Sequence, residues 1–363
     1  MPSRLIRRLL LLSLPALLAG CDAVVMSPSG DIAMQQRNLI VIATVLMLLI
    51  VVPVMVLTGL FAWRYRQSNT KATYSPDWNH STQLELVIWS APLLIVIALG
   101  AVTWIATHTL DPYRKLDRLD ANRPIPADVK PLKVQVVALD WKWLFIYPDY
   151  GIASVNEMAA PVDVPIEFQI TASSVMNAFY VPALAGMIYA MPAMETKLHA
   201  VINKPGDFEG FSSNYSGAGF SHMRFRFLAR DGAAFDRWVA DVRARPESLT
   251  REAYQVLEKP SEREPVRHYG TAMAGLYDAI LNLCVEPTKM CMHDMMKIDA
   301  QGGLGLNNVY NVARLSYDES RSLLRQGPYE DSYVLALCQT TPDRLMTARD
   351  DVPLYGDTTR ELP

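Results

Sequence analysis

Cys21 is the residue of this chain whose neighbours specify a definite chemistry. It follows a Leu-Ala-Gly run at positions 18–20, and a basic start and an apolar stretch over residues 9–18 precede it. A basic region, an apolar core and small residues before a cysteine are typical of a secretory signal with a lipoprotein cleavage box. We therefore predict that residues 1–20 are a signal peptide, that the Cys21 thiol is lipidated, and that the mature chain starts at the outer face of a bacterial inner membrane. A buried structural cysteine is the alternative.

A second group of reactive side chains lies in the run Met-Cys-Met-His-Asp-Met-Met at positions 290–296. Thioethers, a thiol and an imidazole are ligands that suit Cu(I). The alternative is an apolar, Met-rich helical patch that packs on a partner. Cys284 and Cys291 could instead form a disulfide, because the exported compartment is oxidising. Cys338 would then be left over, and with three thiols beside Cys21 the sequence leaves the pairing open.

The composition indicates membrane spans joined to a sizeable water-soluble domain. The chain has 363 residues, a formal charge of −3 and 50% apolar residues, and its mean hydropathy is +0.09. Such a chain is too apolar for an ordinary soluble protein and too polar for one made only of membrane helices. The near-neutral charge gives no indication of a nucleic-acid partner. The sequence shows no nucleophilic triad, phosphate-binding loop or paired carboxylates, so we expect no catalytic residues.

Two uncharged stretches are long enough to cross a bilayer. Residues 39–63 would reach roughly 38 Å as a helix and residues 86–107 roughly 33 Å. Pro53 and Pro92 lie inside them, and membrane helices tolerate such prolines. The alternative is a pair of buried helices of a soluble protein. If Cys21 is outside, residues 64–85 form a cytoplasmic connection, which agrees with their basic side chains.

The exported part, from about residue 108, begins with a strand pattern. Apolar residues alternate with polar ones over 165–171 and 223–227, and residues 133–147 are rich in Val, Trp and Phe. Short strands separated by Gly and Pro predict a β-sandwich or barrel.

The pattern becomes helical after residue 231. An apolar stripe over residues 234–242 predicts a helix that ends before Pro246, and residues 248–258 suggest another short helix. We assign no fold from about residue 259 onward. The domains are therefore expected as follows: signal peptide 1–20, N-terminal tail and transmembrane helices 21–107, periplasmic domain 108–230, and a helical or irregular C-terminal region 231–363.

Four motifs together resemble subunit II of haem–copper oxidases. They are Glu-Leu-Val-Ile-Trp-Ser-Ala-Pro at 85–92, Trp-Lys-Trp at 141–143, Asn-Ala-Phe-Tyr-Val-Pro at 177–182 and Ser-Ser-Asn-Tyr-Ser-Gly-Ala-Gly-Phe-Ser-His-Met at 212–223. They recur in the family's order and spacing, and the resemblance covers residues 21–260. It implies a two-helix transmembrane hairpin and an exported cupredoxin-like β-sandwich.

The family's dinuclear copper centre needs two bridging thiolates and two imidazoles. The two thiolate positions here hold Ser212 and Ser216. The two imidazole positions hold Asn177 and Phe220. An alcohol supplies no bridging thiolate at neutral pH, and a phenyl ring has no donor atom.

The remaining copper positions complete this departure from the family. Asn214 stands where the family has an acidic residue that lends its carbonyl, and Met223 alone still matches. His222 is out of register with the lost imidazole. We therefore expect no dinuclear copper in this chain.

Within this superfamily, such a loss resembles the copper-free bo-type ubiquinol oxidase branch. The resemblance implies that ubiquinol delivers electrons directly to a subunit I, which carries the haems and copper. The resemblance also implies that this chain supports the assembly of subunit I. Further small membrane subunits would be its other partners. Two other functions remain open: a copper-bearing subunit that accepts electrons from cytochrome c, and a free-standing lipoprotein that binds metal through its C-terminal region.

Glu85 stands at the expected cytoplasmic edge of the second span. From its position alone, we expect Glu85 to be a solvated carboxylate, which is favourable at a helix start. The resemblance adds a second interpretation, because the matching Glu of haem–copper oxidases is associated with a proton path into subunit I. An ionisable residue at a membrane boundary is a reasonable proton-entry candidate.

Overall fold

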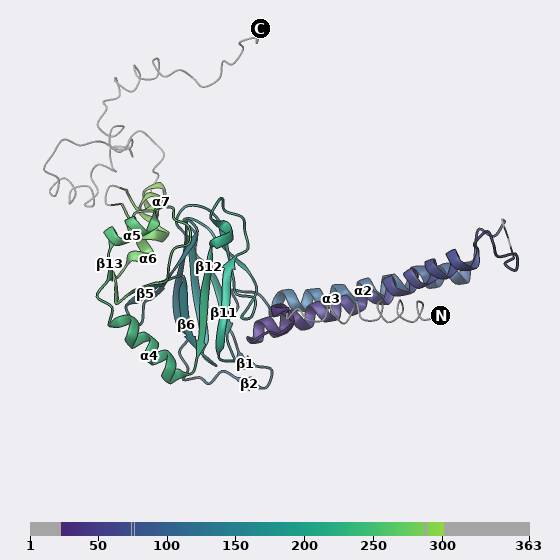
Figure 1. The fold of residues 1–363 in the computed structure, drawn as a ribbon, viewed down its shortest axis with the longest axis horizontal. Helices are drawn as coiled ribbons and strands as arrows, with labels where there is room; N and C mark the ends of the chain where they lie inside the picture. The colour runs from purple at the N-terminus through teal and green to yellow at the C-terminus, as the bar shows by residue number, and fades with distance from the viewer. Residues whose placement is uncertain (1–22, 74, 76, 287–288, 301–363) are drawn as a thin grey trace, which may run out of the picture. The chain divides into compact units, whose positions relative to one another are not determined.

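The computed structural model describes residues 23–73, 75, 77–286 and 289–300. It divides into two compact units, Met1–Tyr277 and Asp278–Pro363. The described part of the first unit contains a pair of long helices and a β-sandwich (Figure 1). Cys21 and Cys338 lie outside the described residues.

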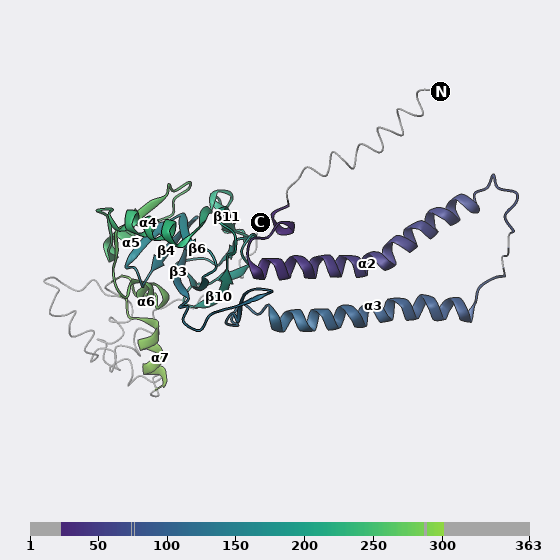
Figure 2. The ribbon, with the colours of Figure 1, turned by 90° about the horizontal axis from the view of Figure 1, so that it is seen from below.

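The two long helices are α2 (Asp31–Arg64) and α3 (Thr82–Thr109), and a short helix η1 (Val24–Met26) precedes them. They run side by side in both views, with their connection at the end away from the sandwich (Figures 1 and 2). Each covers its predicted span and extends beyond it at both ends. Both are long and apolar enough to cross a membrane, and none of the most apolar part of either is buried in the described protein. Exposed apolar surfaces of this extent are typical of membrane or protein interaction sites.

The sandwich consists of two sheets. The six-stranded sheet has the order β10-β7-β3-β4-β5-β14 and the five-stranded sheet the order β6-β12-β11-β8-β9. Neighbours pair antiparallel in these sheets, except for the parallel pairs β3–β7 and β12–β6. The strands of the first sheet are β3 (Leu132–Leu139), β4 (Lys142–Tyr147), β5 (Ile152–Val155), β7 (Pro165–Ala172), β10 (Thr196–Val201) and β14 (Arg267–Tyr269). The strands of the second are β6 (Glu157–Pro161), β8 (Asn177–Tyr180), β9 (Ile188–Ala190), β11 (Gly206–Ser212) and β12 (Arg224–Arg230).

Aromatic rings from both sheets fill the centre of the sandwich. The rings of Phe179 and Phe225 stack at 5.4 Å, and Trp143 lies edge-on to both at 5.5 and 5.7 Å. Phe145 and Phe168 extend the cluster, and all five side chains are buried. Offset and edge-to-face pairs of this kind add stability beyond the apolar area that they bury. The predicted cupredoxin-like sandwich is confirmed.

The sandwich is joined directly to the start of α2. The backbone N–H groups of Ser29 and Gly30 both donate to the Ala183 carbonyl at 2.9 Å. A Cβ on Gly30 would lie 2.5 Å from a backbone oxygen, so glycine is required at this close approach. Asp31 is buried, and its carboxylate accepts from Arg118 at 3.1 Å. Arg118 begins a small hairpin formed by β1 (Arg118–Asp120) and β2 (Arg123–Pro124).

The helix predicted over residues 234–242 is confirmed as α4 (Gly232–Arg243). Asp231 caps it by accepting from the Ala234 N–H at 2.7 Å. The predicted helix over residues 248–258 is wrong at its start, because β13 (Ser248–Leu249) pairs with β15 (Thr271–Ala272). Helix α5 (Arg251–Glu258) begins only after the cap residue Thr250. The segment after residue 259 contributes β14 to the sandwich and continues into α6 (Leu276–Leu281) and α7 (Met292–Ala300).

Candidate functional site

Ser212 connects the segments that resemble the two halves of a copper site. It is the last residue of β11 and pairs with Phe179 of β8. Its Oγ accepts from the Ala178 N–H at 3.3 Å and lies 3.1 Å from Asn177 Oδ1 and 3.2 Å from the Asn214 carbonyl oxygen. Since Ser212 and Asn177 are both buried, these bonds satisfy polar groups that water does not reach. The structure thus brings three of the predicted site positions together.

Amide groups fix the loop on either side of Ser212. The Asn177 side chain donates to the Val175 carbonyl at 3.1 Å, and the Asn214 side chain donates to the Met176 carbonyl at 3.1 Å. Each amide nitrogen thus donates one hydrogen bond to a backbone acceptor. The segment is held by neutral hydrogen bonds at the positions where the resemblance implies copper ligands.

The second part of the loop wraps around Trp141. The Trp141 indole N–H donates to the Ser216 carbonyl at 3.0 Å. A Cβ on Gly217 would lie 3.2 Å from the ring, and one on Gly219 would lie 2.5 Å from it, so both glycines allow the backbone to approach the indole. Ser216 Oγ is buried without a hydrogen-bond partner among the described residues.

Aromatic and aliphatic side chains complete the loop. Phe220 starts the short helix η2 (Phe220–His222), and its ring packs at 5.5 Å against that of Tyr215, which is 75% exposed. Met223 is buried in the core. His222 is exposed, and its Nε2 accepts from Arg263 at 3.2 Å.

This donor set does not fit a dinuclear copper centre. Two hydroxyls stand in place of the bridging thiolates, one amide and a phenyl ring stand in place of the two imidazoles, and the Met223 thioether is a weak donor. Hydrogen bonds within the loop use Ser212, Asn177 and Asn214. The loop is a hydrogen-bonded turn in place of a metal ligand set.

Lys142 of the Trp-Lys-Trp motif is a structural residue. Its ammonium is buried and donates to the Lys259 carbonyl at 2.7 Å and the Ser261 hydroxyl at 2.8 Å. Burial lowers the pKa of Lys142 below its usual value. The contact ties the chain after α5 back to the sandwich.

Sequence reasoning missed a buried ionic cluster around Glu157. Its Oε1 lies 3.0 Å from His268 Nε2 and 3.3 Å from Trp238 Nε1, and its Oε2 lies 3.3 Å from Arg226 Nη1. The hydrogen bond from His268 holds the pKa of the Glu157 carboxyl below its usual value, although burial opposes this shift. His268 is 111 positions away along the chain, so no local motif could have indicated the contact.

Glu85 lies in the first turn of α3, at the end of the helix pair away from the sandwich (Figure 2). Its Oε1 is 2.6 Å from Nδ1 of His80, and both side chains are largely exposed in this chain. The structure therefore places an imidazole and a carboxylate next to each other at the start of α3.

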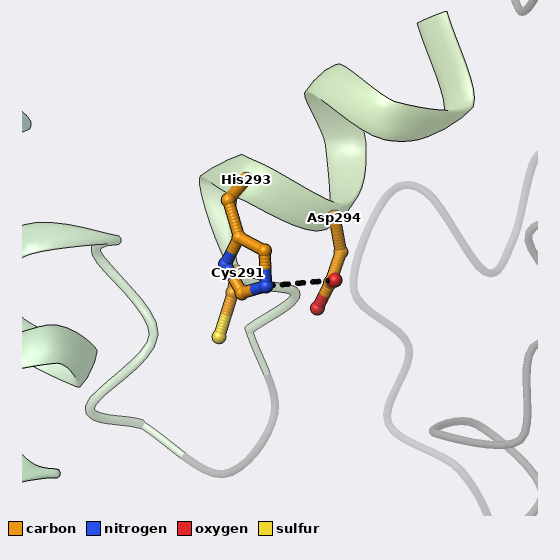
Figure 3. A group of neighbouring side chains, drawn as sticks. All are labelled: Cys291, His293 and Asp294. Carbon is orange, nitrogen blue, oxygen red and sulfur yellow. Dashed lines mark ion pairs between the residues drawn. The ribbon is translucent and has the colours of Figure 1, made fainter. Parts of the chain in front are cut away.

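In the second unit, Cys284 and Cys291 form a disulfide. Figure 3 shows His293 and Asp294 beside Cys291, with His293 Nε2 3.0 Å from Asp294 Oδ1.

Two long apolar helices joined to a cupredoxin-like domain are the class of protein that this fold defines. Comparison with known proteins narrows the class. Residues 151–227 match the family model "Cytochrome C oxidase subunit II, periplasmic domain", and residues 243–288 match "COX Aromatic Rich Motif".

Full-length relatives extend the match over most of the chain. Cytochrome bo(3) ubiquinol oxidase subunit 2 of Pseudomonas putida is 50% identical over 266 residues, which is 73% of this chain and 82% of the relative. Ubiquinol oxidase subunit 2 of Acetobacter aceti is 47% identical over 270 residues, covering 74% and 85%. The periplasmic domain of cytochrome oxidase subunit II from Bradyrhizobium japonicum aligns at 28% identity with a TM-score of 0.30, covering 32% of this chain and 94% of that one.

The chain belongs to the family of quinol oxidase subunit II within the haem–copper oxidases. It is a membrane component of an oxidase complex and carries an exported domain.

Proposed function

We propose that this chain is the copper-free subunit II of a proton-pumping terminal ubiquinol oxidase. Its work is to support the assembly of the catalytic subunit I, while electrons pass from ubiquinol directly into that subunit. The haems and copper used to reduce oxygen to water are then held by subunit I, and this chain holds no redox centre. Further small membrane subunits complete the assembly.

The observation that carries the proposal is the hydrogen-bonded Ser212. A hydroxyl bonded to Asn177 and to the backbone at 178 and 214 occupies the position of a bridging thiolate. Without thiolates there is no dinuclear copper to accept electrons from cytochrome c. The exposed apolar faces of α2 and α3 support the assembly role, because they offer long surfaces to a membrane partner.

The choice of electron donor tests this proposal. The purified complex should consume oxygen with ubiquinol and give no turnover with reduced cytochrome c alone. Sustained oxygen uptake from reduced cytochrome c would refute the proposal. The copper-bearing alternative predicts that outcome.

We further propose that Glu85 collects protons at the cytoplasmic membrane edge and passes them to subunit I. The 2.6 Å contact with His80 supports this role, because the pair offers two adjacent sites for a proton. The uncharged spans of the two helices, residues 39–63 and 86–107, lie between this pair and the sandwich.

We also propose that the sandwich faces the periplasm, that the helices cross the bacterial inner membrane and that Cys21 carries a lipid anchor. The lipid anchor rests on the sequence around Cys21.

A further inference from the structure

Three potential metal ligands converge at the start of α7. One ligand atom each from Cys291, His293 and Asp294 lies within 4.8 Å of the others (Figure 3). His293 is half exposed, and the Asp294 carboxylate is about one-third exposed, so a cation could reach both from solvent. The sequence around these residues had suggested soft-metal ligands, and the proposed oxidase function gives them no role.

Cys284 brings a fourth potential ligand to the same place. Cys284 Sγ is bonded to Cys291 Sγ, and the two Cα atoms are 4.8 Å apart. Both sulfurs are occupied while this bond is intact. Opening it would leave two thiols next to an imidazole and a carboxylate.

The backbone keeps the two cysteines close without the disulfide. The Met292 N–H donates to the Asn282 carbonyl at 2.9 Å, and these residues lie just outside the cysteine pair in sequence. The Cys284 N–H donates to the Ala279 carbonyl at 2.9 Å. The loop ends are therefore held together by hydrogen bonds that reduction does not break.

We propose that reduction of the Cys284–Cys291 disulfide creates a Zn²⁺ site whose ligands are Cys284, Cys291, His293 and Asp294. Two thiolates, an imidazole and a carboxylate form a four-coordinate donor set suited to Zn²⁺. A dithiol reductant supplies two electrons and two protons and itself becomes a disulfide, while the two cysteines become thiols. Zn²⁺ binding then releases both thiol protons, because the ligand is the thiolate.

The test titrates the full-length chain in its purified oxidase complex with Co²⁺, a spectroscopic substitute for Zn²⁺. All variants carry Cys338→Ser, so that the thiols formed in this chain by reduction are those of Cys284 and Cys291. The sample is reduced with a dithiol, which is removed anaerobically before the titration. We expect one additional Co²⁺ per complex after reduction, with visible bands of tetrahedral cobalt and a thiolate charge-transfer band. Excess Zn²⁺ should remove these bands.

Matched variants separate this site from thiols and metal sites of other subunits. His293→Ala should weaken Co²⁺ binding at least about tenfold, since loss of even an outer-shell partner costs 10–100-fold. Cys284→Ser with Cys291→Ser should abolish the thiolate band, whereas His222→Ala, which changes an exposed histidine elsewhere, should leave the spectrum unchanged. Equal Co²⁺ uptake by the reduced parent and by the double-serine variant would overturn the proposal. The proposal would also be overturned if the Cys338→Ser protein bound as much Co²⁺ before reduction as after it.

Discussion

Removing the Glu157 carboxylate should destabilise the exported domain in a pH-dependent manner. Glu157 is 8% exposed and accepts from His268, Trp238 and Arg226. Glu157→Gln keeps the shape but removes the charge, and its amide nitrogen cannot accept, so some of the donors around it lose their acceptor. Arg226 keeps its 3.0 Å bond to Asp207. We therefore expect a loss of about 2 kcal/mol, within the range for a weakened buried polar group.

The melting temperature of the exported domain, followed by calorimetry of the full-length chain in detergent, measures this loss. For a domain of this size, 2 kcal/mol corresponds to a decrease of about 4–8 °C. The control is Glu209→Gln, which removes an exposed carboxylate paired with Arg224. Exposed ion pairs contribute about 0–1 kcal/mol, so the control should melt within about 2–4 °C of wild type.

The pH dependence follows from the lowered pKa of Glu157. A carboxyl whose pKa is lower in the folded state contributes stability above its unfolded pKa, near 4.5. That contribution is lost as the pH falls through the folded pKa. The difference in melting temperature between wild type and Glu157→Gln should therefore be full at pH 7 and shrink below about pH 4.5. A difference that is equal to the Glu209→Gln effect, or constant down to the folded pKa, would refute this reasoning.

Three further predictions address the loop, the membrane edge and the anchor. Ser212→Ala should cost about 1–3 kcal/mol in denaturant unfolding, because it leaves buried polar groups of Asn177 and residue 178 unpaired, whereas Ser213→Ala at the neighbouring exposed position should cost less than about 0.5 kcal/mol. Glu85→Ala should slow ubiquinol oxidation in a complex with normal haem content, and Glu85→Asp should retain more activity. Wild-type turnover in Glu85→Ala would leave only a helix-start role. Cys21→Ser should abolish lipidation in mass spectra of the intact chain with only a mild loss of oxidase activity, because a lipid chain adds little beside inserted helices. A mature N-terminus elsewhere would contradict the predicted cleavage.

The two long helices, α4 and the sandwich strands β3, β4, β7 and β12 followed from local patterns in the sequence. The uncharged spans predicted α2 and α3, since charge-free apolar runs of this length have few alternatives. The alternation over residues 165–171 predicted β7, because one face of that strand contacts the core. The structure brings Asn177 and Ser212, which the motifs had assigned to one site, within 3.1 Å of each other.

The features that sequence reasoning missed depend on contacts between distant segments. The pairing of β14 with β5 joins residues more than 100 positions apart, and it delivers His268 to Glu157. Lys142 is buried only because the chain after α5 returns to accept its hydrogen bonds. Residues 248–249 form a strand because β15 pairs with them, although their own sequence resembles a helix start. The sequence also left the pairing of three cysteines open, and the structure pairs Cys284 with Cys291.

The absence of copper in the exported domain is the claim on which the proposed function depends most directly. Electron paramagnetic resonance of the purified oxidised complex, together with a copper count per haem, measures it. We expect no mixed-valence dinuclear copper signal and no copper beyond that of subunit I. A mixed-valence signal that is lost when Asn177, Ser212 and Met223 are replaced together by alanine in an intact complex would contradict it.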